Sequence, residues 1–238
     1  MGWRWIVMTG RLLGAVLPVV QPLLAGALER QSSPMTAARA GIQGAVTTTA
    51  KTPRPIRVTF DQKVCGAELP DQSVVVDGSG HLANVVVTLV GVKAKAPARE
   101  ITVLNDKCAF VPRVQVVGDK SVIKTASRDP VLHTTVVQQP DGHQLFNVAL
   151  PVPGMEIARP LAGTGALRVG CSTHQWMRGW ILVTDDVATV TGPDGRFTLP
   201  DVPAGTYQLR VWHEALKAAD RTVAVIAGKP LTINVEMK

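Results

Sequence analysis

Short runs in which apolar and polar residues alternate, separated by turn-forming residues, recur along most of the 238-residue chain. A period of two residues is typical of a strand with one buried face. The clearest runs, each expected to form a strand, are 56–60, 73–76, 84–90, 101–104, 166–169, 179–184, 222–226 and 231–235. Asp77-Gly78-Ser79-Gly80, between two of these runs, is a strong turn signal. The pattern therefore predicts an all-β protein.

Residues 1–27 have a different pattern. Arg4 and Arg11 precede or open an apolar stretch, and Ala25-Gly26-Ala27 follows it. This order is typical of a secretory signal peptide that is cleaved after Ala27. Pro and Gln interrupt the apolar stretch, which is short for a membrane helix of about 20 residues. We therefore expect a periplasmic or otherwise extracytoplasmic protein with no membrane span after signal cleavage. A retained membrane anchor is the alternative.

Residues 28–54 contain many Ser, Thr and Ala residues and few large apolar ones, and they show no period. Such a composition predicts a flexible linker between the signal peptide and the folded part of the chain.

The composition agrees with a β protein and excludes several functions. Valine is abundant and aromatic residues make up only 4% of the chain, as expected for strands packed on aliphatic side chains. The formal net charge of +7 falls to +5 (23 basic against 18 acidic residues) when Arg4 and Arg11 leave with the signal peptide. These charges are scattered, and no dense basic stripe indicates a nucleic-acid partner. The sequence also lacks a Gly-rich phosphate loop and a nucleophile elbow. His213 and Glu214 are adjacent, but no nucleophile accompanies them, so we expect a structural role.

One short stretch carries distinctive chemistry. Cys171-Ser172-Thr173-His174-Gln175-Trp176-Met177 brings a thiol, an imidazole and a thioether onto the loop between the expected strands 166–169 and 179–184. Two histidines, one cysteine and a weakly bound methionine describe a blue-copper site. His133 is the best candidate for the second imidazole. The predicted ligands of one type 1-like copper ion are therefore His133, Cys171, His174 and Met177.

This pattern resembles the cupredoxins, the small blue-copper proteins that include plastocyanin and pseudoazurin. The resemblance extends upstream to Phe110-Val111-Pro112, to the Gly118-Asp119 turn and to the run that starts at His133. Its core covers about residues 99–185, within a predicted domain at 55–185 that has extra N-terminal strands. The resemblance implies a Greek-key β-sandwich in which the ring edge of His174 lies near the surface as the electron route. Trp176 would then belong to an apolar docking patch or pack against the sandwich.

The ligand loop departs from the family in its length. Two residues separate His174 from Met177, whereas plastocyanin-like proteins have four. Met177 is therefore an axial ligand or a packing residue. The binuclear copper site of cytochrome oxidase subunit II has a similarly short spacing but needs a second cysteine in the loop, so a mononuclear centre is implied. Thr134 stands where cupredoxins often have an Asn that fixes the cysteine loop.

Three cysteines remain after signal removal, Cys65, Cys108 and Cys171, and an odd number leaves one unpaired in an oxidising compartment. If Cys65 pairs with Cys108, Cys171 is free to bind a metal as a thiolate. The alternative is that Cys171 itself belongs to the disulfide.

The C-terminal residues, 186–238, form a second predicted domain. Asp-Gly-Arg-Phe at 194–197 and Pro-Ala-Gly-Thr-Tyr at 203–207 resemble a carboxypeptidase-regulatory-like, transthyretin-type β-sandwich module. About 50 residues make a marginal core alone, and the strands before residue 98 resemble the start of such a module. One possibility is that these N-terminal strands complete the C-terminal sandwich, with the copper domain inserted between them.

Together these features predict an exported mononuclear copper protein that carries single electrons between periplasmic redox proteins, such as c-type cytochromes or oxidoreductases. We expect no enzymatic activity, and an oxidase-like site is the least favoured of the functions considered. The alternative function is an extracytoplasmic copper-carrying or binding β-sandwich module without electron transfer.

Overall fold

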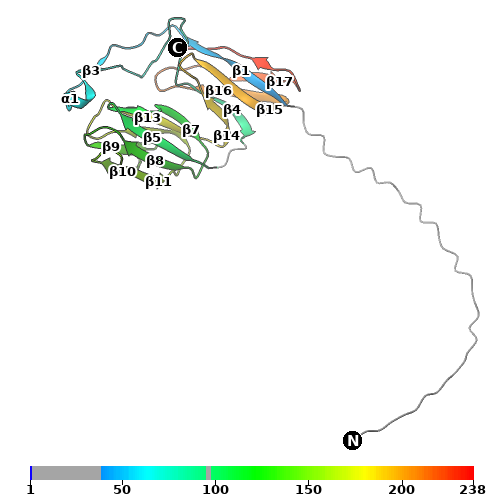
Figure 1. Ribbon diagram of the computed structural model, residues 1–238. Coiled ribbons are helices and arrows are strands. Elements are labelled where there is room, and N and C mark those ends of the chain that lie inside the picture. Colours follow the sequence, from blue (N-terminus) through cyan, green and yellow to red (C-terminus); the bar gives the residue numbers. More distant parts are fainter. Residues whose placement is uncertain (2–38, 95–97) are drawn as a thin grey trace, which may run out of the picture. The chain divides into compact units, whose positions relative to one another are not determined.

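The computed structural model describes residues 1, 39–94 and 98–238 (Figure 1). The predicted signal peptide, 1–27, and the first part of the predicted linker, 28–38, lie outside these residues apart from Met1. Residues 37–238 form one compact unit. The described part of that unit is built from strands and one four-residue helix, which confirms the all-β prediction. Among the described residues, no helix is both long enough and apolar enough to cross a membrane.

The central part of the chain forms a β-sandwich, here called the middle sandwich. One sheet has five strands in the order β10-β9-β12-β13-β7, and the other has four in the order β11-β8-β5-β6. The chain crosses between the sheets several times, as in Greek-key sandwiches. The strands are β5 (Glu100–Asp106), β6 (Ala109–Val111), β7 (Val114–Val117), β8 (Val122–Ser127), β9 (His133–Gln138), β10 (Gln144–Leu150), β11 (Glu156–Pro160), β12 (Gly165–Gly170) and β13 (Arg178–Val183).

A second sandwich, the split sandwich, is assembled from both ends of the described chain. Its first sheet has the order β15-β1-β18, with β19 also paired to β1, and its second has the order β14-β4-β16-β17. The strands are β1 (Arg39–Thr48), β4 (Val86–Lys93), β14 (Asp186–Val190), β15 (Arg196–Pro203), β16 (Gly205–Trp212), β17 (Arg221–Val225), β18 (Leu231–Thr232) and β19 (Val235–Met237). Its core combines Ile42 and Leu89 with Leu199 and Leu209. The possibility that N-terminal strands complete the C-terminal sandwich is therefore confirmed.

Strand β1 corrects the linker prediction for residues 39–48. β1 pairs with β15 on one side and with β18 and β19 on the other. It has few large apolar residues, and at Gly44 a close neighbour leaves no room for a side chain. A Cβ on Gly44 would collide with the backbone carbonyl of Ile233, so only glycine fits there.

The predicted domain boundaries at 55–185 and 186–238 need the same correction. β4 lies between β14 and β16 in a sheet of the split sandwich. A core of this kind cannot be closed by residues 186–238 alone, because β1, the central strand of the first sheet, and β4, an inner strand of the second, come from the N-terminal side.

Residues 56–69 form what we call the cap segment. It consists of β2 (Ile56–Arg57), α1 (Gln62–Cys65) and β3 (Glu68–Leu69). The strand expected at 56–60 therefore ends early, and the run at 73–76 contributes only an isolated bridge. Val58 and Cys65 are buried in the core of the middle sandwich. A disulfide joins Cys65 to Cys108, whereas Cys171 is free and buried. The predicted pairing is confirmed.

Candidate metal centre

The strand pairing of the five-stranded sheet brings the predicted ligands to one end of the middle sandwich. His133 is the first residue of β9, and Cys171 directly follows β12. These strands are antiparallel, with Gly170 opposite Val136, so the start of β9 meets the end of β12. The pairing of Gly170 with Arg178 then closes the ligand loop between β12 and β13. The inner face of this sheet is apolar and packs in the core of the middle sandwich. This packing holds the ligand loop on a rigid base.

Three donor atoms meet in a compact triangle. Nδ1 of His133 lies 3.0 Å from Nδ1 of His174, and the Cys171 sulfur lies 3.9 and 3.8 Å from these two nitrogens. A point equidistant from the three atoms is about 2.1 Å from each, within the roughly 2.0–2.3 Å of metal–nitrogen and metal–sulfur bonds. His133 and His174 are fully buried and Cys171 is 6% exposed. The donor set fits a metal ion.

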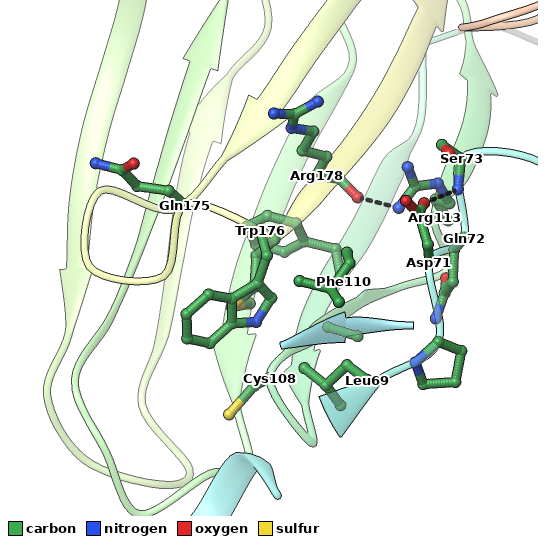
Figure 2. Close-up of a pocket in the computed structure, with 14 residues that line it drawn as sticks. Leu69, Asp71, Gln72, Ser73, Cys108, Phe110, Arg113, Gln175, Trp176 and Arg178 are labelled. Carbon is green, nitrogen blue, oxygen red and sulfur yellow. Dashed lines mark hydrogen bonds between the residues drawn. The ribbon is translucent and has the colours of Figure 1, made fainter. Parts of the chain in front are cut away.

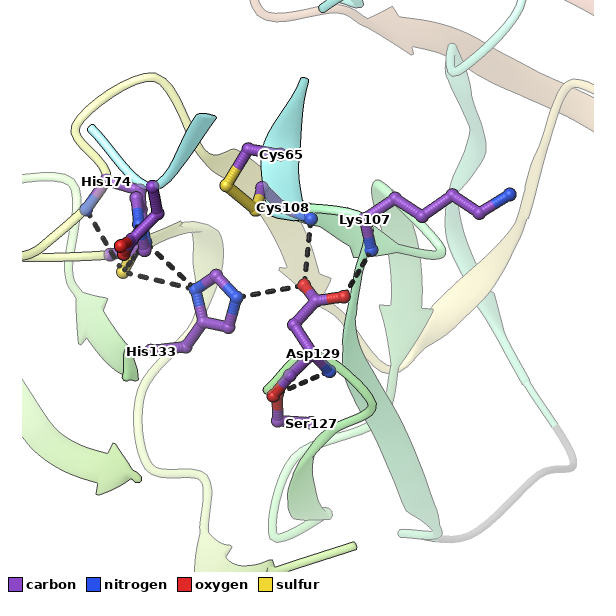
Figure 3. Close-up of a disulfide and its surroundings, with 9 residues drawn as sticks. Cys65, Lys107, Cys108, Ser127, Asp129, His133 and His174 are labelled. Carbon is purple, nitrogen blue, oxygen red and sulfur yellow. Dashed lines mark hydrogen bonds and ion pairs between the residues drawn. A yellow bond between two sulfur atoms is a disulfide. The ribbon is translucent and has the colours of Figure 1, made fainter. Parts of the chain in front are cut away.

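A buried carboxylate holds the ring of His133 (Figure 3). Nε2 of His133 lies 2.9 Å from Oδ2 of Asp129, and the two side chains are 0% and 7% exposed. Asp129 also accepts the backbone N–H groups of Lys107 and Cys108, each at 2.8 Å. Because a carboxylate only accepts, Nε2 carries the proton and Nδ1 keeps its lone pair for the centre of the triangle.

A second carboxylate does the same for His174. Nε2 of His174 lies 3.0 Å from Oδ2 of Asp61, the residue that precedes α1 in the cap segment. Two nitrogen lone pairs 3.0 Å apart repel each other unless a cation or a proton lies between them. The expectation that the ring edge of His174 lies near the surface is wrong, because the cap segment covers it.

The sulfur of Cys171 sits among donors that favour a thiolate. The backbone N–H groups of Thr134 and His174 point at it from 3.3 and 3.4 Å. Burial opposes ionisation, but the neighbouring His133 imidazole and hydrogen bonds from Thr134 and His174 outweigh it and lower the pKa of Cys171 to about 6. Burial also opposes charge on His133, yet the neighbouring Cys171 and Asp129 raise its pKa overall. A thiolate is the form of cysteine that binds metals.

Thr134 replaces the Asn that cupredoxins often carry after the first histidine. Its hydroxyl accepts the backbone N–H of Ser172 at 2.7 Å and lies 3.7 Å from the Cys171 sulfur. Thr134 therefore ties the start of β9 to the ligand loop, which is the role expected of the missing Asn.

Met177 and Trp176 follow His174 in the same loop. Met177 is 2% exposed, belongs to the same apolar cluster as Cys171, and donates its backbone N–H to the carbonyl of His174 at 2.9 Å. Its bond to a metal stays a prediction. Trp176 is half-buried, packs against that cluster, and has its ring centroid 5.0 Å from that of His174. Both residues also line a pocket of about 430 Å³ with Phe110 and Arg113 (Figure 2).

Two other groupings do not form a reactive site. Cys108, Asp129 and His133 also lie close together, but Cys108 is disulfide-bonded and offers no thiolate. His213 is 2% exposed and its Nδ1 accepts the backbone N–H groups of Ala215 and Leu216. Glu214 pairs with Arg113. The structural role expected for His213 and Glu214 is therefore confirmed.

The comparison with family models gives one match, at the C-terminal end of the chain. Residues 181–238 match the family model described as carboxypeptidase regulatory-like domain. No curated protein matches the chain significantly.

Solved structures similar to this chain include cupredoxins. A purple cupredoxin from Nitrosopumilus maritimus is 21% identical over 37% of this chain and 100% of its own, with a TM-score of 0.32. Amicyanin from Paracoccus versutus is 15% identical over 41% of this chain and 97% of its own, also with a TM-score of 0.32. A copper-containing nitrite reductase from Thermus scotoductus SA-01 is 18% identical over 58% of this chain and 28% of its own, with a TM-score of 0.31. The chain thus has cupredoxin-like structural neighbours, and the assignment of its site rests on its own residues.

Sequence reasoning missed the two carboxylates. Asp129 stands four residues before His133, a spacing that could have drawn attention to it. Asp61 lies 113 residues from His174 in a segment expected to begin with a strand, so no local signal marked it.

Proposed function

We propose that this protein is a mononuclear copper electron carrier. The observation that supports the proposal is the buried triangle of Cys171 Sγ and the Nδ1 atoms of His133 and His174, with Nε2 of each ring held by a carboxylate. One soft thiolate and two imidazoles select copper among the common metals. Met177 is the proposed fourth, weaker ligand.

The chain's own residues give this site its properties. Bound copper supplies a centre that gains and loses one electron. Asp129 and Asp61 fix the tautomer and orientation of the two imidazoles, and the N–H groups of Thr134 and His174 stabilise negative charge on Cys171. A site whose ligands are held by carboxylates and strand ends rearranges little between oxidation states, and a small rearrangement favours fast electron transfer.

Burial argues for electron transfer rather than for catalysis or copper delivery. An oxidase-like site needs an open position for its substrate, and a copper donor needs ligands that a partner can reach. Here both imidazoles are fully buried and the cysteine is almost so. An electron, unlike a substrate or an ion, needs no opening.

We further propose that the protein works outside the cytoplasm with small redox proteins such as c-type cytochromes or oxidoreductases. The disulfide between Cys65 and Cys108 supports an oxidising compartment, in agreement with the predicted signal peptide. Trp176, half-buried beside His174, is the proposed apolar part of a docking surface, and such encounters are small and transient.

Electron transfer can be distinguished from copper carriage by measuring whether the protein keeps its copper while it is oxidised and reduced repeatedly. The purified protein is loaded with one equivalent of copper and cycled repeatedly between oxidant and reductant, with a high-affinity Cu(I) chelator present in half of the samples. An electron carrier should keep its copper through many cycles and lose it to the chelator only slowly. Rapid transfer of Cu(I) to the chelator, with no reversible cycling, would replace the proposal with copper carriage.

A further inference from the structure

The cap segment covers the imidazole that would otherwise be the most accessible ligand. His174 is 0% exposed, whereas Asp61, its carboxylate partner, is 26% exposed and lies between the ring and solvent. Phe60 also approaches His174, with ring centroids 6.0 Å apart, and is itself 56% exposed. The shield over His174 is therefore thin and is made by two neighbouring residues of the cap segment.

A covalent tether holds this shield in place. Asp61 immediately precedes α1, and Cys65 ends it, so a single turn separates the carboxylate from the disulfide. The backbone carbonyl of Asp61 accepts the N–H groups of Val64 and Cys65, each at 2.9 Å. A helix of four residues has little stability alone, so the disulfide and the contact with His174 hold it in place.

The same disulfide leads to the other imidazole. Cys108, the second half of the disulfide, donates its backbone N–H to Asp129, and Asp129 holds His133. Figure 3 shows the disulfide directly beside Asp129 and His133. Both carboxylate–histidine pairs are thus joined through Cys65–Cys108, although they come from segments far apart in the sequence.

We propose that Asp61 is a positioning residue and that residues 56–69, tethered by Cys65–Cys108, form a lid that closes the metal centre at His174. The proposal rests on the proposed function for its effect on copper, but not for the existence of the lid. The lid keeps water and small ligands from the His174 side of the centre, and Asp61 keeps the His174 ring in the orientation that points Nδ1 at Cys171 and His133.

Access to Cys171 in the metal-free protein tests the lid without copper. The rate of alkylation of Cys171 by iodoacetamide is measured at pH 8 for the wild type, Asp61→Asn and Asp61→Ala. Asp61→Ala removes the acceptor of the His174 N–H, and Asp61→Asn replaces a charged acceptor with a neutral one. The lid should open more often in both variants, and we expect alkylation about tenfold faster in Asp61→Ala, with a smaller increase in Asp61→Asn. Cys65→Ser/Cys108→Ser should show the same increase as Asp61→Ala, because the tether is lost and no second thiol is created.

Lys63→Ala is the matched control, because Lys63 lies in α1 and is exposed without contacting His174. Its alkylation rate should stay within twofold of the wild type. Far-UV circular dichroism identifies any variant that fails to fold, and Asp61→Asn, a change at a partly exposed position, keeps the test informative if the double cysteine variant unfolds. Wild-type rates in both Asp61 variants would overturn the lid.

The copper-loaded protein tests positioning. Asp61→Asn should shift the reduction potential and the electron paramagnetic resonance spectrum and should admit azide or imidazole to the metal, whereas Asp61→Glu should restore part of the wild-type behaviour. A normal spectrum and potential in Asp61→Ala would overturn the positioning role. If the wild type takes up no copper, the proposed function fails, while the alkylation rates still decide the lid.

Discussion

Asp129 and His133 form a buried carboxylate–imidazole pair, with Oδ2 and Nε2 2.9 Å apart and almost no exposure of either side chain. The carboxylate is itself held by two backbone N–H groups from the turn after β5. His133 therefore belongs to a chain of contacts that runs from the metal centre to the disulfide-bonded turn. Residues of the fold therefore set its ring orientation.

Asp129→Asn tests this pair. An amide presents only one acceptor oxygen to donors that now use two, so one buried N–H loses its partner. We expect the free energy of unfolding of the metal-free protein to fall by about 1–3 kcal/mol and the copper affinity to fall roughly 10–100-fold. Denaturant titration and competition with a copper chelator measure the two effects.

Asp106→Asn is the control for Asp129→Asn, because Asp106 makes an ion pair with the exposed Arg128 and does not touch the site. Loss of a surface pair changes stability by no more than about 1 kcal/mol. If Asp129→Asn behaves like this control, the buried pair does not organise the centre.

The thiol of Cys171 should ionise at a pH well below the range that is usual for cysteine. Its pKa is lowered to about 6 because the neighbouring His133 imidazole and hydrogen bonds from Thr134 and His174 outweigh the effect of burial. The thiolate is the reactive form, so alkylation of the metal-free protein should rise as pH increases and be half-maximal near pH 6. Copper affinity should decrease below that pH, where protons compete for the sulfur. In denaturant the midpoint should return to about 8.5, and a folded midpoint near that value contradicts the predicted thiolate.

Met177→Leu decides whether the thioether is a ligand. Leucine conserves the volume of this buried side chain, so the protein should lose less than about 1.5 kcal/mol of stability. If the sulfur is a weak axial ligand, the variant should keep its visible colour and show a shifted reduction potential, because that bond mainly tunes the potential. Met237→Leu, at an equally buried position of the split sandwich, should leave the potential unchanged. An unshifted potential in Met177→Leu would make Met177 a packing residue.

The ion pair between Arg113 and Glu214 joins the two sandwiches. Nε and Nη2 of Arg113 lie 2.9 and 2.6 Å from the same carboxylate oxygen, and each side chain is 10% exposed. Glu214→Gln removes the ion-pair partner of this largely buried arginine, and we expect a loss of about 3 kcal/mol in the free energy of unfolding. Asp220→Asn, which disrupts the exposed pair with Arg210, should cost no more than about 1 kcal/mol. Equal losses of unfolding free energy in the two variants would show that the pair between Arg113 and Glu214 does not stabilise the contact between the two sandwiches.

The candidate metal site was largely predictable because most of its residues are local. Cys171, His174 and Met177 lie within one loop, and the strands on either side show the expected alternation. To predict His133 as well, only one further inference was needed, which is that the second imidazole comes from another strand. The role of Asp61 could be recognised only from the structure, since only tertiary packing of the cap segment brings its carboxylate to His174.

The limits of the fold prediction have a similar cause. The run at 84–90 was recognised as a strand, but its neighbours in the sheet are β14 and β16, which lie about 100 residues later. In β1, position 44 must be a glycine because the backbone carbonyl of Ile233 lies against it. The composition of β1 taken alone is typical of a linker. Alternation predicts a strand, whereas only the pairing reveals the sandwich to which the strand belongs.

The most direct test of a copper–thiolate centre is a Cu(II) titration of the metal-free protein, followed by visible absorption, for the wild type and Cys171→Ser. A thiolate bonded to Cu(II) absorbs intensely in the visible, whereas a hydroxyl is a hard, poor ligand for such absorption. The wild type should develop colour up to one equivalent of copper, bleach on reduction and regain its colour on oxidation, and Cys171→Ser should stay colourless. A wild type that binds no copper, or colour that survives in Cys171→Ser, would contradict the account.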